Sequence, residues 1–193
     1  MSVFQCLACP LLAALLALPA SAADLDLPAL MAMLAAVPSA KDSFIESKRS
    51  NLLSVPLVLK GMLIYGRPDH LEKHVLSPYQ ETTVIAGNAV TIENRGLKQR
   101  RSFSLSSSSV VTALIEGMRA TLAGDAPALE RHYRIRLEGP PDSWLLTLTP
   151  RDEKLAGLVT SIRIAGARER LRRIEIDESS GDQSVMLIAP EAP

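Results

Sequence analysis

The residues with the most specific chemistry lie in an apolar segment, residues 61–71, which contains the pair Arg67-Pro68. Proline fixes its own φ and favours an extended conformation for the residue before it, so Arg67 is expected at the rim of a β-sheet. A guanidinium there is either a solvated surface charge or a group that holds a specific partner. The sequence around Arg67 is needed to distinguish these two interpretations.

Groups that commonly perform catalysis are sparse in this chain. It contains no Gly-x-Ser-x-Gly nucleophile elbow, no phosphate-binding loop and no dinucleotide-binding fingerprint. The serine run 106–109 is better explained as the cap of a helix. We therefore expect no enzyme, no catalytic residue and no cofactor, and a function in binding.

Histidines at helical spacing raise the question of a metal site. His70 and His74 are four residues apart, which on a helix would bring two imidazoles to one face. They follow Pro68 in a strand-like segment, where this spacing separates the residues by about 13 Å. The third histidine, His132, has no cluster of carboxylates or thiols beside it in the sequence. No metal site is predicted.

The N-terminus predicts export. Residues 7–18 form an apolar run that is too short to span a bilayer, and residues 20–22 (Ala-Ser-Ala) have the small-x-small pattern of a signal-peptidase site. Residues 1–22 are therefore predicted to be a secretory signal peptide, although residues 1–10 lack the usual Lys or Arg. The mature protein, residues 23–193, is expected to be a single domain.

The composition further narrows the possible sites and partners of the mature protein. Both cysteines, Cys6 and Cys9, lie in the segment to be removed, so the mature protein would have no disulfide and no thiolate metal site. The 21 Lys and Arg residues balance 21 Asp and Glu residues, which argues against nucleic acid or an acidic membrane surface as a partner. Stability must come from an ordinary hydrophobic core, for which about 170 residues suffice.

Two apolar helices are expected. The first covers residues 27–37, because Asp26 can cap it, Pro28 lies in its first turn and Pro38 stops it. It is apolar on almost every side, so it is either a core helix or a cover for an apolar ligand. The second covers residues 110–123 and ends at Gly124.

The rest of the chain alternates with a period of two, which indicates strands. Gly87-Asn88 has the composition of a tight hairpin turn. The fold class is therefore mainly β (α+β), with about 10 to 11 strands in one antiparallel sheet that must curl, and with apolar helices on one side. The expected strands are residues 44–49, 60–65, 71–77, 82–86, 89–93, 99–105, 133–138, 144–148, 158–165, 170–177 and 183–188.

In this order of elements the chain resembles the periplasmic lipoprotein carriers of the LolA-like family. The resemblance covers nearly the whole mature chain, but residues 50–60 depart from the family, which suggests a divergent branch. Its motifs are Phe44-Ile45-Glu46, Gly61-x-Leu63-x-x-x-Arg67-Pro68-x-x-Leu71, Pro78, Gly87-Asn88 and Trp144-x-Leu146-x-Leu148-x-Pro150.

The resemblance implies an incompletely closed β-barrel whose helical lid, residues 27–37 and 110–123, covers a hydrophobic cavity. It implies a carrier, a monomer in the periplasm of a Gram-negative bacterium, that ferries the acyl chains of lipoproteins from an inner-membrane exporter to an outer-membrane acceptor. The family arginine that matches Arg67, next to Pro68, holds the lid shut and is needed for cargo hand-off.

The predicted cavity lining is aliphatic, whereas the family cavity is usually aromatic; only 4% of this chain is aromatic. Another lipid or an acylated or aryl-polyene product is therefore an alternative cargo, and a sensor module of envelope stress is an alternative function. An enzyme acting on lipid is opposed by the missing catalytic residues. The expected lining residues are Leu30, Met31, Met33, Leu34, Leu63, Val90, Ile92, Leu114, Met118 and Trp144.

Overall fold

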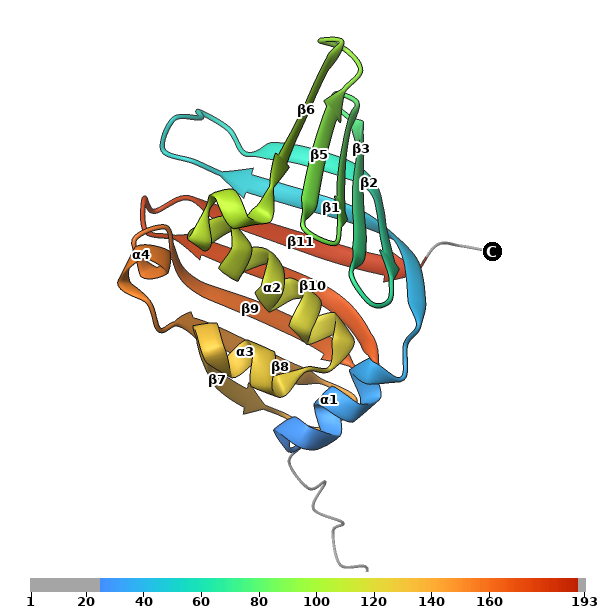
Figure 1. Ribbon diagram of the computed structural model, residues 1–193, viewed down its shortest axis with the longest axis vertical. Coiled ribbons are helices and arrows are strands. Elements are labelled where there is room, and N and C mark those ends of the chain that lie inside the picture. Colours follow the sequence, from blue (N-terminus) through green and yellow to red (C-terminus); the bar gives the residue numbers. More distant parts are fainter. Residues whose placement is uncertain (1–24, 191–193) are drawn as a thin grey trace, which may run out of the picture.

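A computed structural model describes residues 25–190 of the chain. The predicted signal peptide, residues 1–22, lies outside the described residues. Eleven strands form one antiparallel sheet with the order β6-β5-β4-β3-β2-β1-β11-β10-β9-β8-β7 (Figure 1). The strands are β1 (Ser39–Arg49), β2 (Leu57–Gly66), β3 (His70–Ser77), β4 (Glu81–Ala86), β5 (Ala89–Asn94), β6 (Gln99–Ser104), β7 (Tyr133–Glu138), β8 (Trp144–Pro150), β9 (Val159–Ala167), β10 (Arg170–Glu178) and β11 (Gln183–Pro190).

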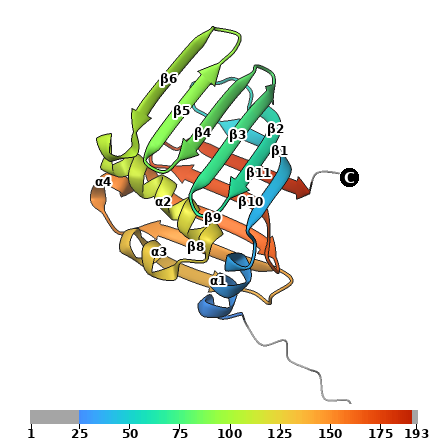
Figure 2. The same ribbon diagram turned by 45° about the vertical axis from the view of Figure 1, so that its right-hand side comes forward.

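The sheet curls strongly but does not close. β6 and β7 are its two edges and are not paired with each other in the described part of the chain. Figure 2 shows β2–β6 standing at an angle to β7–β11, with the helices inside the bend. The predicted fold class, an incompletely closed antiparallel barrel with helices on its concave side, is confirmed.

The helices lie on the concave side of the sheet. They are α1 (Leu27–Ala35), a 3-10 turn η1 (Leu105–Ser107), α2 (Ser109–Ala123), α3 (Ala126–His132) and α4 (Glu153–Ala156). The two expected long helices are confirmed within two residues at each end. The sequence pattern missed α4, which is four residues long with Leu155 as its buried side chain, and which the Asp152 carboxylate caps by accepting from two backbone N–H groups.

Local chemistry explains where α1 and α2 begin and end. The Asp26 carboxylate accepts a hydrogen bond from the Ala29 N–H at 2.8 Å, and Pro28 occupies the first turn of α1. The Ser108 hydroxyl accepts from the Val111 N–H at 3.4 Å at the start of α2. Gly124 ends α2 with φ +70°, a left-handed conformation that glycine adopts without steric cost.

The main hydrophobic core lies between the helices and β7–β10. Its largest fully buried side chains are Trp144 and Tyr133. The Tyr133 hydroxyl donates to the Ala113 carbonyl at 3.2 Å, and the Trp144 indole donates to the Arg168 carbonyl at 2.8 Å, so both rings satisfy their polar ends. The aliphatic members with less than 2% exposure are Leu30, Leu34, Leu129, Leu146, Leu148 and Leu155.

The concave face of β1–β3 has a much smaller core. Phe44, Leu59 and Val75 of these strands form a separate buried cluster with Met186 of the neighbouring β11. The helices pack on the other half of the sheet, so the space between α2 and the inner face of β1–β4 is only partly filled by side chains. This space is the candidate site.

Candidate ligand-binding cavity

Three adjoining cavities lie between the helices and the concave face of the sheet. The inner one, about 270 Å³, lies between α2 and β9–β10 and has an almost wholly aliphatic lining that includes Leu114 and Met118. The middle one, about 360 Å³, lies between α2 and β1–β4. Met118, Leu122, Leu171, Ile174 and Ile176 line both of them, so the two adjoin along α2 and β10.

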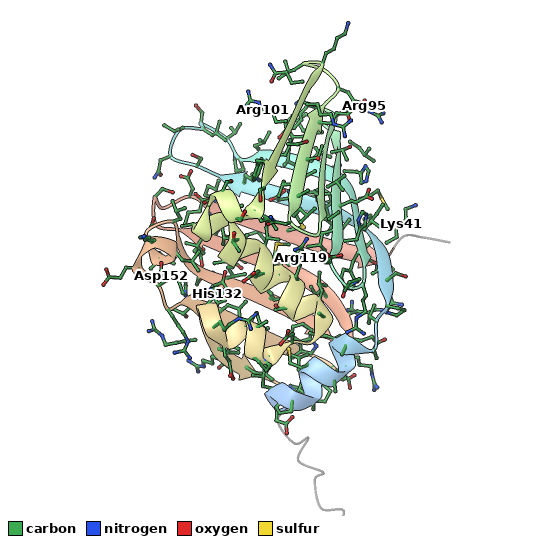
Figure 3. All side chains as sticks on the ribbon, in the orientation of Figure 1. Lys41, Arg95, Arg101, Arg119, His132 and Asp152 are labelled. Atoms are coloured by element: carbon green, nitrogen blue, oxygen red, sulfur yellow. The ribbon has the colours of Figure 1, made fainter. Side chains whose placement is uncertain are left out.

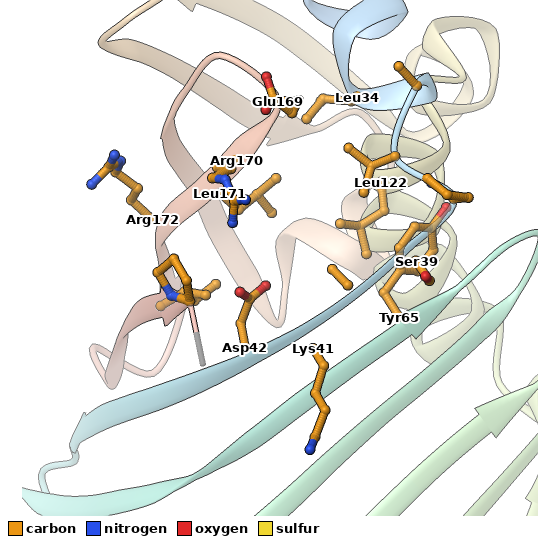
Figure 4. Close-up of a pocket in the computed structure, with 16 residues that line it drawn as sticks. Leu34, Ser39, Lys41, Asp42, Tyr65, Leu122, Glu169, Arg170, Leu171 and Arg172 are labelled. Atoms are coloured by element: carbon orange, nitrogen blue, oxygen red, sulfur yellow. The ribbon is translucent and has the colours of Figure 1, made fainter. Parts of the chain in front are cut away.

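A third, outer cavity of about 550 Å³ lies where the chain passes from α1 to β1. It shares Asp42, Tyr65 and Leu122 with the middle cavity, and Figure 4 shows these side chains around it. Its outer wall carries charged side chains of β10 and of the loop before it, such as Glu169 and Arg170. Polarity thus rises from the aliphatic inner cavity to the charged outer one, and all three volumes are of the order of known ligand pockets, about 300–1,000 Å³.

The predicted lining residues divide into three groups. Leu34 lines the outer cavity, Leu63 the middle one, Leu114 the inner one, and Met118 both the inner and the middle one. Leu30, Met31 and Trp144 are buried in the main core, and Met33 packs against that core. In the β4–β5 pairing, Val90 lies opposite Ile85 and Ile92 lies opposite Thr83. Ile85 and Thr83 line the middle cavity.

Arg67 connects the sheet to the C-terminal ends of α1 and α2. Arg67, Pro68 and Asp69 form the turn between β2 and β3. The Arg67 guanidinium donates from Nη2 to the carbonyl of Ala123 at 3.0 Å and from Nη1 to the carbonyl of Ala35. These carbonyls belong to the last residues of α2 and α1, which lack partners within their own helices. A cation at two helix C-termini also faces the negative ends of both helix dipoles.

The two helix ends can share one arginine because they approach each other closely. A Cβ at Gly124 would lie 2.1 Å from the Met31 carbonyl oxygen and 2.8 Å from the Ala35 Cβ, so only glycine fits between α1 and the end of α2. Gly124 therefore serves both as the stop of α2 and as the contact that brings the two acceptors within reach of Arg67.

A second arginine, which the sequence analysis did not single out, makes a parallel connection. Arg119 extends from α2 toward the β2–β3 turn (Figure 3), where its Nη2 donates to the Asp69 carbonyl at 2.8 Å. The Arg67 and Arg119 bonds run in opposite directions between the same two elements. Together they fasten α2 to the turn on the rim of the cavity.

Glu46 belongs to a family motif in the sequence, but its place in the wall of the middle cavity was not predicted. Glu46 is only 4% exposed and accepts hydrogen bonds from the Lys73 ammonium and from the Ser184 hydroxyl, the latter at 2.6 Å. Burial alone would raise the pKa of Glu46, but Lys73 and Ser184 outweigh it and hold that pKa below its usual value. Burial lowers the pKa of Lys73, and Glu46 opposes this effect.

The histidines of β3 converge on one carboxylate. The Nε2 atoms of His70 and His74 lie 2.6 and 2.5 Å from the two oxygens of Glu72, because alternate residues of a strand share a face. These two hydrogen bonds lower the pKa of Glu72. Across residues 25–190, no three His, Cys, Asp or Glu side chains are arranged to hold a metal ion.

The apolar stretches of the described helices are limited in length. None of the helices found in residues 25–190 is both long and apolar enough to cross a bilayer.

Comparison with protein families gives one match that covers most of the chain. Residues 19–193 match the family described as outer membrane lipoprotein carrier protein LolA-like. Among curated proteins, none matches the chain.

Several solved structures are similar in fold at low sequence identity. A LolA superfamily protein from Nitrosomonas europaea is 13% identical, with 86% of this chain and 93% of that chain covered and a TM-score of 0.44. A conserved protein from Thermus thermophilus is 12% identical, with 85% and 86% covered and a TM-score of 0.49. The Pseudomonas aeruginosa MucA/MucB complex contains a chain that is 13% identical, with 88% and 59% covered and a TM-score of 0.47.

Proposed function

Because the chain belongs to the LolA-like family of outer membrane lipoprotein carriers, we propose that it is a periplasmic carrier of acylated cargo. In this proposal, residues 1–22 direct export across the inner membrane of a Gram-negative bacterium. The mature protein then takes the acyl chains of a lipoprotein from an inner-membrane exporter and delivers them to an outer-membrane acceptor. Members of this family are carriers or binding proteins, and we propose no catalytic step.

The observation that carries the proposal is the position of Arg67. Its guanidinium bridges the C-terminal carbonyls of α1 and α2 at the rim of the cavities that these helices cover. Opening the cover breaks both hydrogen bonds and exposes the apolar faces of the helices. Arg67 and Pro68 therefore form the latch in this proposal, and α1 and α2 form the lid.

A latch is useful because acyl chains bind too strongly to be released unaided. Burial of one CH₂ group contributes about 0.8 kcal/mol, so a 16-carbon chain gains on the order of 12 kcal/mol. A carrier that first has to open a closed lid offsets part of this gain, because the cost of opening is subtracted from the affinity. The cargo can then pass to an acceptor that binds it more tightly.

A second cargo class is supported by the character of the lining. Tyr65 is the aromatic side chain among the residues that line the three cavities, and the rest are mostly aliphatic. Trp144, the single tryptophan, is buried in the main core. An aliphatic and Met-containing wall is deformable and would also accept a free lipid or an aryl-polyene product.

The proposal is tested by replacing Arg67 and following cargo. The Arg67→Leu variant should fold, bind acylated cargo at least as tightly as the wild type, and release less of it to the acceptor. Arg95→Leu is the matched control, because Arg95 is 72% exposed and belongs to the turn between β5 and β6. Native mass spectrometry of protein purified from the periplasm should find a triacylated lipoprotein or another acylated molecule. Normal transfer by Arg67→Leu would refute the latch, and a protein that never carries lipid would refute the carrier function.

A further inference from the structure

The connection between β1 and β2 presents apolar side chains to solvent. Eleven large apolar side chains of residues 25–190 are exposed, and four of them lie within residues 52–58. Residues 50–59 contain no charged side chain. Single exposed leucines are common on protein surfaces, whereas a cluster of exposed apolar side chains is typical of an interaction site. The four side chains are Leu52 (93% exposed), Leu53 (47%), Val55 (72%) and Val58 (45%).

Hydrogen bonds hold the backbone of this loop in place. The Asn51 N–H donates to the Asp182 carboxylate and the Asn51 side-chain amide donates to the Ser180 carbonyl, both at 3.2 Å. The Leu53 N–H donates to the Ser50 carbonyl at 3.0 Å. The loop is therefore fastened to the turn between β10 and β11 while its leucines point into solvent. A partner that covers them does not have to order the loop first, so binding costs less conformational entropy.

The shape of the loop favours a fluid partner. Figure 1 shows the connection between β1 and β2, drawn in cyan, projecting from the end of these two strands. A projecting apolar tip needs a partner that closes around it. A lipid interface does so without a preformed groove, and the affinity of such contacts grows with the apolar area that enters the interface.

Two cations lie behind the apolar tip. Arg49 precedes the loop and Lys60 follows it; both are exposed, and neither makes a side-chain hydrogen bond or an ion pair within residues 25–190. The pairing of β1 with β2 places Arg49 and Lys60 on the same outer face as Val58. Long basic side chains of this kind keep their charge at the level of lipid phosphates while their stems contact the apolar layer.

Carboxylates at the same end of the sheet are engaged elsewhere. Asp182 accepts the hydrogen bond from Asn51. Glu46 is buried against Lys73, and Glu178 belongs to the lining of the inner cavity. No carboxylate therefore belongs to the tip itself.

We propose that the loop of residues 50–56 docks the protein on a phospholipid bilayer by inserting Leu52, Leu53 and Val55 into the interface. Arg49 and Lys60 then lie at the level of the phosphates. Zwitterionic lipids also carry a phosphate, so the contact does not need an acidic membrane surface, which the balanced charge of the chain disfavours. The inference goes beyond the proposed function, because it concerns where the protein docks and holds for any cargo.

Docking through this loop leaves the latch accessible. β2 extends from the loop to Gly66, which directly precedes Arg67, and its ten residues span about 30 Å. The Arg67 turn thus lies at the opposite end of β2 from the proposed membrane contact. A protein partner can reach α1 and α2 there while the loop holds the carrier at the bilayer.

Flotation of the mature protein with phosphatidylcholine vesicles tests the proposal. The wild type should float with the vesicles, and Leu52→Ser/Val55→Ser should lower the partition coefficient at least about 10-fold, because burial of each apolar side chain favours the bound state. Leu187→Ser is the matched control: Leu187 is 52% exposed in the middle of β11, away from the loop, so this variant should bind like the wild type.

Fluorescence gives a second measurement that does not depend on removing apolar side chains. Leu52→Trp places a tryptophan at the tip, and lipids brominated in their acyl chains should quench it. Trp144, the single natural tryptophan, is buried in the main core, so the emission of the wild type should stay unquenched on the same vesicles. Thermal unfolding of the three variants should coincide with that of the wild type, because each replaces exposed side chains.

Three results overturn the inference. They are a double serine variant that floats like the wild type, a Leu52→Trp emission that brominated lipid leaves unchanged, and a wild type that binds no vesicles. If the wild type binds no vesicles but Leu52→Ser/Val55→Ser loses cargo transfer, the loop belongs to a protein partner instead. None of these results bears on the carrier function, which the Arg67→Leu variant and the identification of bound cargo test separately.

Discussion

The two halves of the sheet use the same strand geometry but differ in what covers them. The concave face of β7–β10 is covered by the helices, and their side chains fill the space with a continuous core around Trp144 and Tyr133. The concave face of β1–β4 has a four-residue cluster and otherwise borders the cavities. One half therefore provides the stability of the fold, whereas the other half provides the space for a ligand.

This difference indicates that the cavity arises because the helices cover the two halves of the sheet unequally, and not because its strands have a special sequence. Both halves have aliphatic residues that face inward, such as Leu146 on β8 and Leu63 on β2. α2 packs on one half and faces the other across the middle cavity. Arg67 and Arg119 fasten α2 to the β2–β3 turn at the rim of this space.

The largest effect should come from a matched pair of leucines. Leu146→Ala removes a fully buried side chain from the main core and should lower the free energy of unfolding by about 2–5 kcal/mol. Leu63→Ala enlarges an existing cavity and should cost less than about 1.5 kcal/mol, because fewer atoms pack against this side chain. Urea unfolding measures both values. Equal costs would show that the two halves are packed alike.

Two tyrosines, Tyr133 in the main core and Tyr65 in the cavity wall, allow the two halves of the sheet to be compared, first at alkaline pH. Burial raises the pKa of Tyr133 from 10.0 to about 12. The folded state thus disfavours the phenolate, and stability is full below pH 10 and is lost as the pH rises toward 12. A shift of this size corresponds to about 2–3 kcal/mol, and Tyr133→Phe should remove this loss.

At neutral pH, replacing Tyr133 by Phe and replacing Tyr65 by Phe should have different effects on stability. Tyr133→Phe removes the hydrogen bond to Ala113 and should cost about 1 kcal/mol. Tyr65→Phe removes a hydroxyl without a described partner and should leave stability unchanged or raise it slightly. Thermal unfolding at pH 7 and pH 11 distinguishes these expectations. A greater loss for Tyr65→Phe than for Tyr133→Phe would contradict the assignment of Tyr65 to the cavity.

The smallest effect on stability should come from the two arginines that join α1 and α2 to the β2–β3 turn. Arg67→Leu and Arg119→Leu each remove hydrogen bonds to backbone carbonyls and should each cost about 1 kcal/mol. Hydrogen exchange should quicken in α1 and α2 in Arg67→Leu and in α2 in Arg119→Leu, while exchange in β8 stays at the wild-type rate. Arg95→Leu serves as the control in both measurements. Uniform acceleration over the whole chain would mean that the arginines support the fold instead of the lid.

Much of the fold could be predicted from local patterns. Alternation identified the strands, Gly87-Asn88 marked a hairpin, and Asp26 and Gly124 limited the helices. Periodicity does not distinguish a core from a cavity wall, because both require inward-facing apolar side chains. For this reason the sequence did not separate Trp144, which is buried in the core, from Leu63, which lines the cavity.

The polar contacts of the site could not be predicted from the sequence, because they depend on strand register and on backbone atoms. Ser184 is 138 residues from Glu46, and only the pairing of β1 with β11 brings them together. The acceptors for Arg67 are the carbonyls of two alanines, whose side chains carry no signal in the sequence. Arg119 had no motif around it, so its bond to the β2–β3 turn became evident only in the structure.

The central claim is that acyl chains occupy the space beneath α2. It is tested most directly by photo-crosslinking in the periplasm from p-benzoylphenylalanine placed at Met118, which lines the inner and middle cavities, with Leu158, 52% exposed, as the control position. The account predicts a crosslink from position 118 to an acylated molecule, abolished when its acylation is blocked, and none from position 158. A crosslink that forms equally with the unacylated cargo, or from position 158 alone, would contradict it.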